Sequence, residues 1–353
     1  MSAAPDTHTA HTPIARIFAI AAGISVLVAL IVMAFSWPAV TAEAKDIPVA
    51  VAGPEQAVTA IEEQFATGDS PFELTVVDDR DAAVTAIRTR EAAGAIVLGD
   101  APELLTASAA GTSAAVVKQL ATPLQAALNA QAAAASAASG QQITAPTLVV
   151  TDVVPFAESD AAGLGMNAAF FPLLLGGMAG GIAIAFLVVG SLRRVLAVTV
   201  YAVFGGALLT GILQGWFGSI QGDYWANAAA FALSLAAIAA PIVGAVAVMG
   251  RAGIAVGPVV MMLFANPISG AALPSSYLPG AWGAVGHWFP PGASAVLVRN
   301  LSYFPDADST FPWLVLAGWT GVGLLLALVG RFRTAGGSEP DAQAAHEDDP
   351  VAA

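Results

Sequence analysis

The stretch Ser191-Leu192-Arg193-Arg194 separates two long apolar runs, residues 167–190 and 195–217. Its two arginines are the only charges in this part of the chain. About 20 apolar residues are enough to cross the hydrocarbon core of a bilayer as an α-helix, so each run is long enough to span a membrane. Because the link is so short, the two helices must form an antiparallel hairpin, with both arginines on one side of the membrane.

Further apolar runs flank this hairpin in both directions along the sequence. Only 10% of the residues are charged, 57% are hydrophobic, and the mean hydropathy is +0.75. Soluble globular chains have about 25% charged residues. We therefore expect an α-helical polytopic membrane protein with six transmembrane helices. The expected spans are residues 15–35, 167–190, 195–217, 227–249, 252–272 and 311–330.

Arginine marks alternate connectors between these runs, which is the positive-inside pattern of multi-pass membrane proteins. These arginines are Arg16, Arg193, Arg194, Arg251, Arg331 and Arg333. The pattern places the short N-terminus (residues 1–14) and the polar, disordered tail (331–353) in the cytoplasm. The segments 44–165, 218–226 and 273–310 then lie outside the cell membrane.

Residues 44–165 form an expected extracytoplasmic α/β domain inserted between the first and second spans. Strand patterns occur at 47–52, 72–77, 95–98 and 148–154, with helices between the first three. This alternation predicts parallel pairing with right-handed crossovers. A longer helix is expected from Thr112 to about Ala135, interrupted at Pro123.

The start of this domain leaves a second interpretation open. Ala42-Glu43-Ala44 resembles a signal-peptidase site that follows an apolar run. The run is longer than the 7–15 residues usual for a signal peptide, so we favour a retained span.

Few residues carry recognisable chemistry. The chain has no cysteine, and its four histidines are scattered without metal-ligand spacing. The acidic cluster around Asp79 is better explained as a helix N-terminus than as a calcium site. Arg88 and Arg90 are interpreted as a solvated helix face, and His287 beside Trp288 as interfacial packing. We expect no enzyme activity, no metal, no bound cofactor and no nucleic-acid partner.

A glycine-rich run lies in the second expected span. Gly176, Gly177, Gly180 and Gly181 make two overlapping GxxxG patterns, which let another helix approach closely. The partner helix belongs either to the same chain or to a second copy across a dimer seam.

The segment 264–304 is apolar and aromatic but rich in proline. Pro267, Pro274, Pro279 and the pair Pro290-Pro291 exclude one regular helix. We expect short helices that dip into the outer leaflet as a re-entrant-like loop (273–310) between the last two spans. Arg299 is expected to reach the head-group layer or to cap a helix end.

The order of elements, with one early span, a large outer domain and five later spans, resembles the ABC-2-type transporter permease family, especially its phage-infection-protein-like branch. The motif residues of the last outer loop that carry this resemblance are Asn266, Pro267, Gly270, Leu278, Pro279, Pro290, Pro291, Gly292, Arg299, Tyr303 and Phe304. The resemblance implies an export permease that moves an amphiphilic or envelope-related substrate outward as a homo- or heterodimer. It also implies a separate cytoplasmic ABC ATPase, with Arg193 and Arg194 as the coupling contact.

The chain itself cannot supply an ATP site of the P-loop type. Such a loop requires Gly-Lys-Ser/Thr, and the two lysines, Lys45 and Lys118, do not follow glycine. The expected cytoplasmic links are short and offer an ATPase little surface. This favours the alternative of a non-transporting envelope protein, such as a secretion accessory, receptor or scaffold, that acts through its outer domain.

Overall fold

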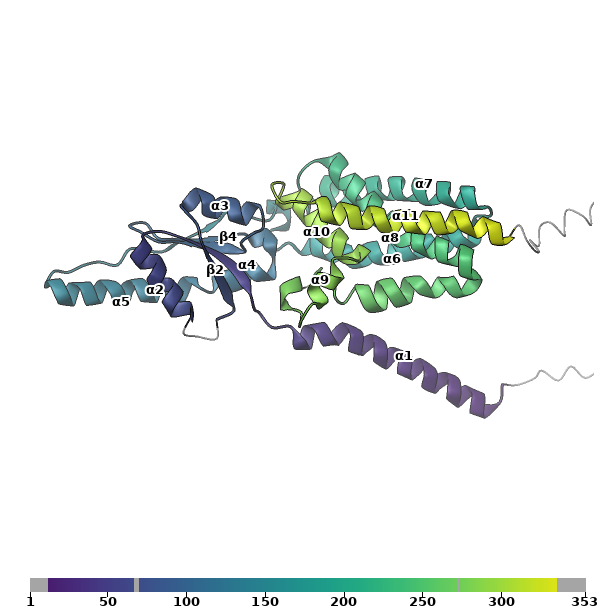
Figure 1. The fold of residues 1–353 in the computed structure, drawn as a ribbon, viewed down its shortest axis with the longest axis horizontal. Coiled ribbons are helices and arrows are strands. Elements are labelled where there is room, and N and C mark those ends of the chain that lie inside the picture. Colours follow the sequence, from purple (N-terminus) through teal and green to yellow (C-terminus); the bar gives the residue numbers. More distant parts are fainter. Residues whose placement is uncertain (1–11, 67–69, 272, 335–353) are drawn as a thin grey trace, which may run out of the picture.

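The computed structural model of the chain describes residues 12–66, 70–271 and 273–334. Within these residues the chain forms a small five-stranded sheet with flanking helices and a body of long helices (Figure 1). We call residues 47–160 the sheet domain and residues 164–334 the helical body. All five strands fall between the first long helix, α1 (Ile14–Thr41), and the second, α6 (Leu164–Leu187).

The sheet has the strand order β2-β1-β3-β4-β5. β1 pairs in parallel with both β2 and β3, as the alternating sequence pattern predicts. In the β1–β2 pair Ile47 lies opposite Phe72. β3 and β4 are antiparallel, whereas β4 and β5 are parallel. The strands are β1 (Ile47–Ala52), β2 (Phe72–Val76), β3 (Gly94–Val97), β4 (Glu103–Thr106) and β5 (Val149–Asp152).

Local signals explain most helices of the sheet domain. The Asp79 carboxylate accepts a hydrogen bond from the Ala82 backbone N–H at 2.8 Å and so caps α3. The expected helix from Thr112 is two helices instead, and the break lies before Pro123, which sits in the first turn of the second helix. The helices are α2 (Glu55–Ala66), α3 (Arg80–Arg88), η1 (Ser108–Ala110), α4 (Thr112–Lys118), α5 (Ala121–Ser139) and η2 (Glu158–Asp160).

Five helices of the described residues are long and apolar enough to cross a membrane. They are Ile14–Thr41, Leu164–Leu187, Ser191–Trp216, Tyr224–Ala255 and Thr310–Gly330. The third combines α7 (Ser191–Thr210) with a π-helical turn, η3 (Gly211–Trp216). α8 (Tyr224–Met249) is the most buried of them and packs against α6, α7 and α11 (Thr310–Thr334). The chain is thus mostly helical, with the apolar character of a membrane protein.

The predicted fifth span, residues 252–272, is not confirmed as an α-helix. The chain turns at Gly250, which has a positive φ of 65°. It continues as a 3-10 helix, η4 (Gly250–Ala255), and a π-helix, η5 (Gly257–Ala265). Pro258 has no N–H to donate in the regular pattern, and Pro267 lies two residues after the end of η5. The count of six regular spans therefore rests on a segment that is helical but irregular.

The expected outer loop folds into short helices: η6 (Ser275–Tyr277), α9 (Trp282–Gly286) and α10 (Pro290–Tyr303). α10 is largely buried and packs against α8 and α11. Pro290 and Pro291 occupy its first turn, where a missing N–H costs no helical hydrogen bond. At 14 residues, α10 is about 21 Å long and too short to cross a bilayer.

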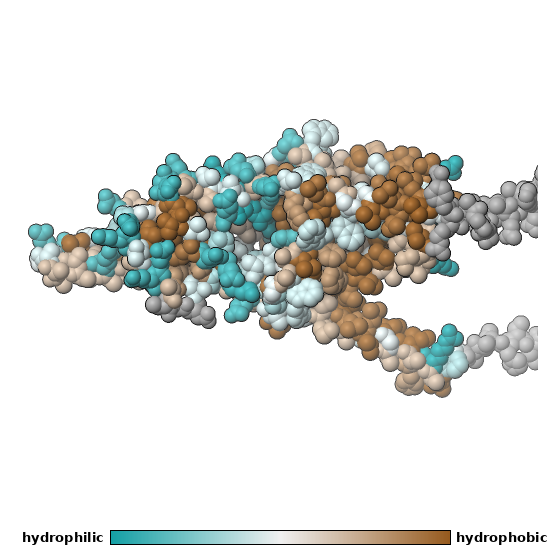
Figure 2. All heavy atoms as spheres, in the orientation of Figure 1, coloured by the Kyte–Doolittle hydropathy of each residue, from teal (hydrophilic) through white to brown (hydrophobic). Residues whose placement is uncertain are grey.

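The helical body has two chemically different ends. The start of α1 and the end of α11 lie at the end away from the sheet domain (Figure 1). α6 starts beside the sheet domain, so its link to α7, with Arg193 and Arg194, also lies at that far end. Figure 2 shows a hydrophobic band between this far end and the more hydrophilic sheet domain. The connector arginines of the sequence pattern thus gather at one end of the body.

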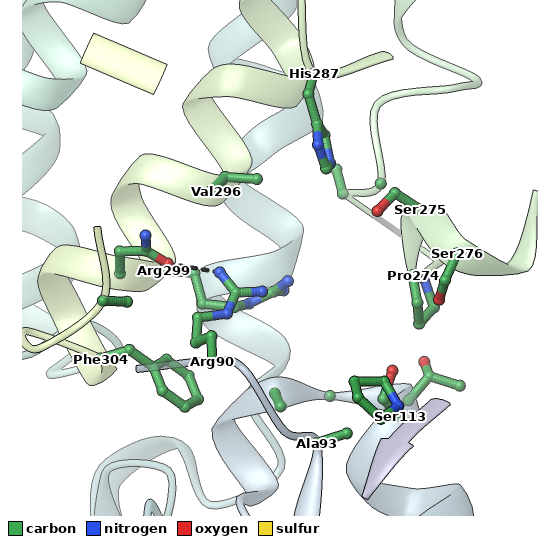
Figure 3. A pocket seen from close by; sticks show the side chains of 18 of the residues that line it. Arg90, Ala93, Ser113, Pro274, Ser275, Ser276, His287, Val296, Arg299 and Phe304 are labelled. Atoms are coloured by element: carbon green, nitrogen blue, oxygen red, sulfur yellow. Dashed lines mark hydrogen bonds between the residues drawn. The ribbon is translucent and has the colours of Figure 1, made fainter. Parts of the chain in front are cut away.

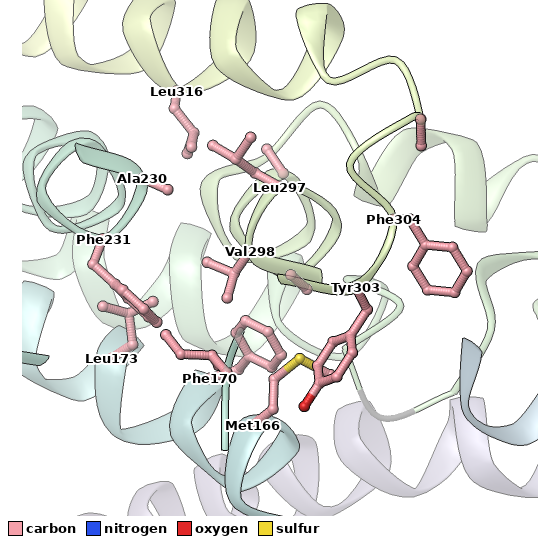
Figure 4. Close-up of a cluster of buried hydrophobic side chains, with 14 of the residues drawn as sticks. Met166, Phe170, Leu173, Ala230, Phe231, Leu297, Val298, Tyr303, Phe304 and Leu316 are labelled. Atoms are coloured by element: carbon pink, nitrogen blue, oxygen red, sulfur yellow. The ribbon is translucent and has the colours of Figure 1, made fainter. Parts of the chain in front are cut away.

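One buried cluster joins the two parts. Ile87 and Leu105 of the sheet domain belong to the same hydrophobic cluster as Phe231 and Leu297 of the helical body. Figure 4 shows the body's share of this cluster, where side chains of α6, α8, α10 and α11 converge. The Phe156 ring contacts the Tyr303 ring edge-on, with centroids 5.6 Å apart. The sheet domain is therefore packed onto the helices and not merely tethered to them.

Candidate functional site

A cavity of about 360 Å³ lies where the sheet domain meets the helical body. Ligand pockets usually have volumes of roughly 300–1,000 Å³. Its lining comes from both parts of the chain: residues 89–90, 92–93 and 110–113 of the sheet domain, and residues 270–271, 273–276, 296, 299–300 and 307–308 of the helical body, with Pro48, Asn167, His287 and Phe304. Figure 3 shows Arg90, Arg299, His287 and Ser275 around the cavity. Its lining includes two arginines, a histidine and several serines, so we treat it as the candidate functional site.

Arg299 projects from α10 and is only 9% exposed. Its Nη2 donates a hydrogen bond to the Asn167 side-chain oxygen in α6 at 2.7 Å. Its buried Nε has no hydrogen-bond partner in the structure. Burial, and to a smaller extent the charge of Arg90, lower the pKa of Arg299 to about 10. Arg299 stays cationic at neutral pH, and its side chain is buried against α6.

Arg90 approaches the same cavity from the sheet domain. It follows the end of α3 with a positive φ of 64°, unusual for a residue other than glycine. Its Nη1 donates a hydrogen bond to the Asn300 side-chain oxygen at 2.5 Å. Its guanidinium also lies over the Phe304 ring, 5.3 Å from the ring centre. The prediction that Arg90 belongs to a solvated helix face is therefore wrong, because the chain turns it inward.

Asn300 holds several groups together at this point. Besides accepting from Arg90, its side-chain nitrogen donates to the Asp308 backbone oxygen at 3.3 Å and to the Ser309 hydroxyl at 3.2 Å. Asp308 lines the cavity but is exposed, and its carboxylate accepts a hydrogen bond from the Thr310 backbone N–H at 2.8 Å. This bond lowers the pKa of Asp308.

The opposite wall carries hydroxyl groups and one imidazole. Ser113, Ser275, Ser276 and His287 line it (Figure 3). Burial lowers the pKa of His287, and the nearby Arg90 charge adds to the effect. His287 therefore lines the cavity close to the charge of Arg90.

Of the family-like residues of the outer loop, Gly270, Arg299 and Phe304 line this cavity. η5 ends at Ala265, Asn266 and Pro267 follow it, and Gly270 has a positive φ of 72°. Gly292 leaves no room for a side chain, because a Cβ there would lie 3.0 Å from the Ser269 backbone oxygen and closer still to that of Gly286. Pro290 and Pro291 start α10, and about two and a half helix turns later α10 carries Arg299 and Asn300.

The glycine-rich run faces helices of the same chain. A Cβ on Gly177 would lie 2.8 Å from the Ile238 side chain, and one on Gly181 would lie 2.9 Å from the Ala239 backbone in α8. Gly176 and Gly180 face Tyr201 of α7, whose hydroxyl donates to the Gly176 oxygen at 2.7 Å. A dimer seam at these glycines would therefore require α6 to separate from its own neighbours.

The two arginines of the α6–α7 link differ in their surroundings. Arg194 donates to the Val188 and Ala185 backbone oxygens at 2.8 and 3.0 Å, so it caps the C-terminus of α6. Arg193 is exposed. Of the two predicted coupling residues, only Arg193 presents its charge freely at the surface.

Sequence reasoning missed Arg90, Asn167 and Asn300 as members of one site. Asn167 and Asn300 carry side-chain amides next to apolar runs, and Arg299 is an isolated charge in an apolar segment. Polar residues at the ends of spans give a usable signal, but Arg90 lies 210 positions from its partner Asn300 and no local pattern joins them.

A separate apolar groove of about 470 Å³ runs along α11, lined by Trp288, Phe311, Leu314, Val315, Gly318, Trp319 and Val322. The Trp319 indole N–H donates to the Trp288 backbone oxygen at 2.8 Å and fixes one wall. Trp288 directly follows His287 of the polar cavity.

The described residues hold no cluster of three or more histidine or carboxylate groups suited to a metal ion. No protein-family model, no curated protein and no solved structure matches the chain, so family membership is not shown by comparison.

Proposed function

We propose that this chain is the membrane permease subunit of an ABC-2-type exporter that moves an amphiphilic or envelope-related substrate outward with a separate ATPase. The observation that carries the proposal is the position of α10. This largely buried, non-spanning helix contains part of the family-like motif and stands between the sheet domain and the long helices. A substrate leaving the membrane along the helical body would meet this junction and its polar cavity.

The gathering of arginines at one end of the body supports a defined orientation. Under the positive-inside rule that end lies in the cytoplasm and the sheet domain lies outside the cell membrane. α8 ends at the arginine end, whereas α11 begins beside the sheet domain. The chain from Gly250 to the outer loop must therefore return along the body, which supports a sixth crossing in 3-10 and π geometry.

Co-purification of an ATPase, combined with a charge reversal at the α6–α7 link, tests the proposed partner. We expect the protein, purified in mild detergent, to bring with it a protein that contains a P-loop and hydrolyses ATP. Arg193→Glu should remove that partner, because it reverses an exposed charge at the link. Arg88→Glu makes the same charge change on an exposed helix of the sheet domain and should retain the partner. Absence of an ATPase from the wild-type preparation would reject this function.

A non-transporting envelope protein is the second candidate, and one feature favours it. Helix α5 projects from the sheet domain away from the helical body (Figure 1) and is largely exposed. A protruding helix of this kind suits contact with another envelope component. If no ATPase co-purifies but removal of residues 125–142 abolishes binding of an envelope partner, this second function holds.

A further inference from the structure

The cavity at the junction has an unbalanced charge. Arg90 and Arg299 both line it, and their hydrogen-bond partners, Asn300 and Asn167, are neutral amides. The ion pair found among the described residues joins Arg80 and Glu103 and involves neither of them. Two guanidinium groups therefore face one cavity, and no carboxylate of the described residues forms an ion pair with either.

Such an arrangement is costly unless a further group completes it. A buried charge is normally paired, because removal from water is not compensated by neutral partners alone. Arg299 is nine-tenths buried and its Nε lacks any acceptor. The acidic residue of the lining, Asp308, is exposed and already bonded to Thr310. An anion with several acceptor oxygens would complement this arrangement.

We infer that the junction cavity binds the phosphoryl group of an anionic ligand, with Arg90 and Arg299 as its principal donors. The guanidinium fork matches the geometry of phosphate oxygens and can donate two parallel hydrogen bonds. The hydroxyls of Ser113, Ser275 and Ser276 on the facing wall supply neutral donors for the remaining oxygens (Figure 3). The site does not depend on transport, since a receptor or scaffold could use it equally.

The same phosphoryl chemistry can come from the membrane or from solution. A phospholipid head group could enter the cavity from the membrane, with its chains remaining against the apolar surface of the helical body. Inorganic phosphate or a soluble phosphate ester could enter from the side of the sheet domain. The two sources need separate arms of one experiment.

The test measures thermal unfolding of the full chain in phosphate-free, uncharged detergent. In one arm inorganic phosphate is added, with chloride at equal ionic strength as the reference. In the other arm phosphatidylglycerol is added to the same detergent, with a diacylglycerol of the same chains, which has no phosphoryl group, as the reference. A ligand present at 100 times its dissociation constant stabilises the folded state by about 2.7 kcal/mol, which corresponds to several degrees in a protein of this size.

We expect the wild-type protein to be stabilised in at least one arm. The Arg299→Gln variant should bind the stabilising phosphate compound about tenfold more weakly or worse, which corresponds to about 1.4 kcal/mol. Arg88 is an exposed arginine of the sheet domain, so the control variant Arg88→Gln should bind as the wild type does. If Arg299→Gln does not fold, Arg299→Lys keeps the charge but loses the fork and should bind more weakly than wild type. No stabilisation in either arm, or equal loss in Arg88→Gln and Arg299→Gln, would overturn the inference.

Discussion

Arg90 and Asn300 lie 210 positions apart in the sequence, yet the Arg90 guanidinium donates a hydrogen bond to the Asn300 side-chain oxygen at 2.5 Å. This contact joins the end of α3 in the sheet domain to α10 in the helical body. It also holds Arg90 over the Phe304 ring and beside the cavity. The junction is therefore a specific polar joint set in a shared apolar core.

Replacing Asn300 should loosen this joint. Asn300→Leu removes the acceptor for Arg90 and the donor to Asp308 and Ser309. Leaving a charged donor without its partner costs about 1.5–3 kcal/mol, so we expect unfolding at a temperature several degrees lower. Limited proteolysis should also cut the sheet domain from the body more rapidly. Asn129→Leu, at an asparagine of the projecting helix α5, is the control; equal effects of the two changes would argue against a specific joint.

The glycines of α6 should prove sensitive to a single methyl group. A Cβ on Gly181 meets the Ala239 backbone at 2.9 Å, so Gly181→Ala forces α6 away from α8 and should cost about 1–3 kcal/mol. Gly321→Ala, in α11 with open space around it, should leave stability unchanged or slightly raised. Thermal unfolding in detergent compares them. A Gly181→Ala protein with normal stability but a smaller oligomer would instead support a dimer seam.

The two arginines of the α6–α7 link should separate into a structural and a surface residue. Arg194→Gln removes the hydrogen bonds to the Val188 and Ala185 oxygens and should lower the free energy of unfolding by about 1–3 kcal/mol. Arg193→Gln should leave it unchanged within about 0.5 kcal/mol, because Arg193 is exposed. Chemical unfolding monitored by tryptophan fluorescence distinguishes them, and a larger loss for Arg193→Gln would contradict the observed cap.

His287 should make the protein less stable in mild acid. Burial and then the Arg90 charge lower its pKa in the folded state, so the unfolded chain, with an ordinary histidine pKa of about 6.5, binds the proton more readily. The contribution of His287 to the free energy of unfolding is therefore fully present above pH 6.5 and declines as the pH falls below that value. Arg90, Arg299 and Asp308 line the same cavity and stay charged over this range.

His287→Gln should therefore flatten the fall in unfolding temperature between pH 7.5 and pH 5.5. Measurement of the unfolding temperature across this range in wild type and variant tests the point. An unchanged slope in the variant would mean that other groups set the acid sensitivity.

The sequence predicted the long helices well, because uninterrupted apolar runs leave few other options for a chain in a membrane. It also predicted β1, β2 and the Asp79 cap, whose signals are local. β4 was missed because Glu103–Thr106 is only four residues long and has no clear alternation. The 3-10 and π segments after Gly250 were read as a regular helix, since apolar composition does not report backbone geometry.

The site was predictable only in part. Arg299 and the prolines of the outer loop stood out because charge and proline are rare in apolar sequence. The approach of Arg90 depends on the positive φ at the end of α3 and on the packing of a whole domain onto α10. Contacts of this range arise from tertiary structure, so no window of sequence contains them.

The threading of the chain, meaning which connectors lie on which side of the membrane, is the central claim of this account. The orientation, the export function and the exposure of the sheet domain all depend on it. The chain has no cysteine, so single cysteines can be labelled without background. Gln142→Cys lies on an exposed part of the sheet domain and Ser191→Cys on the α6–α7 link. In intact cells a membrane-impermeant maleimide should label Gln142→Cys, whereas Ser191→Cys should react only after the membrane is opened. Labelling of Ser191→Cys but not of Gln142→Cys in intact cells would contradict the proposed threading.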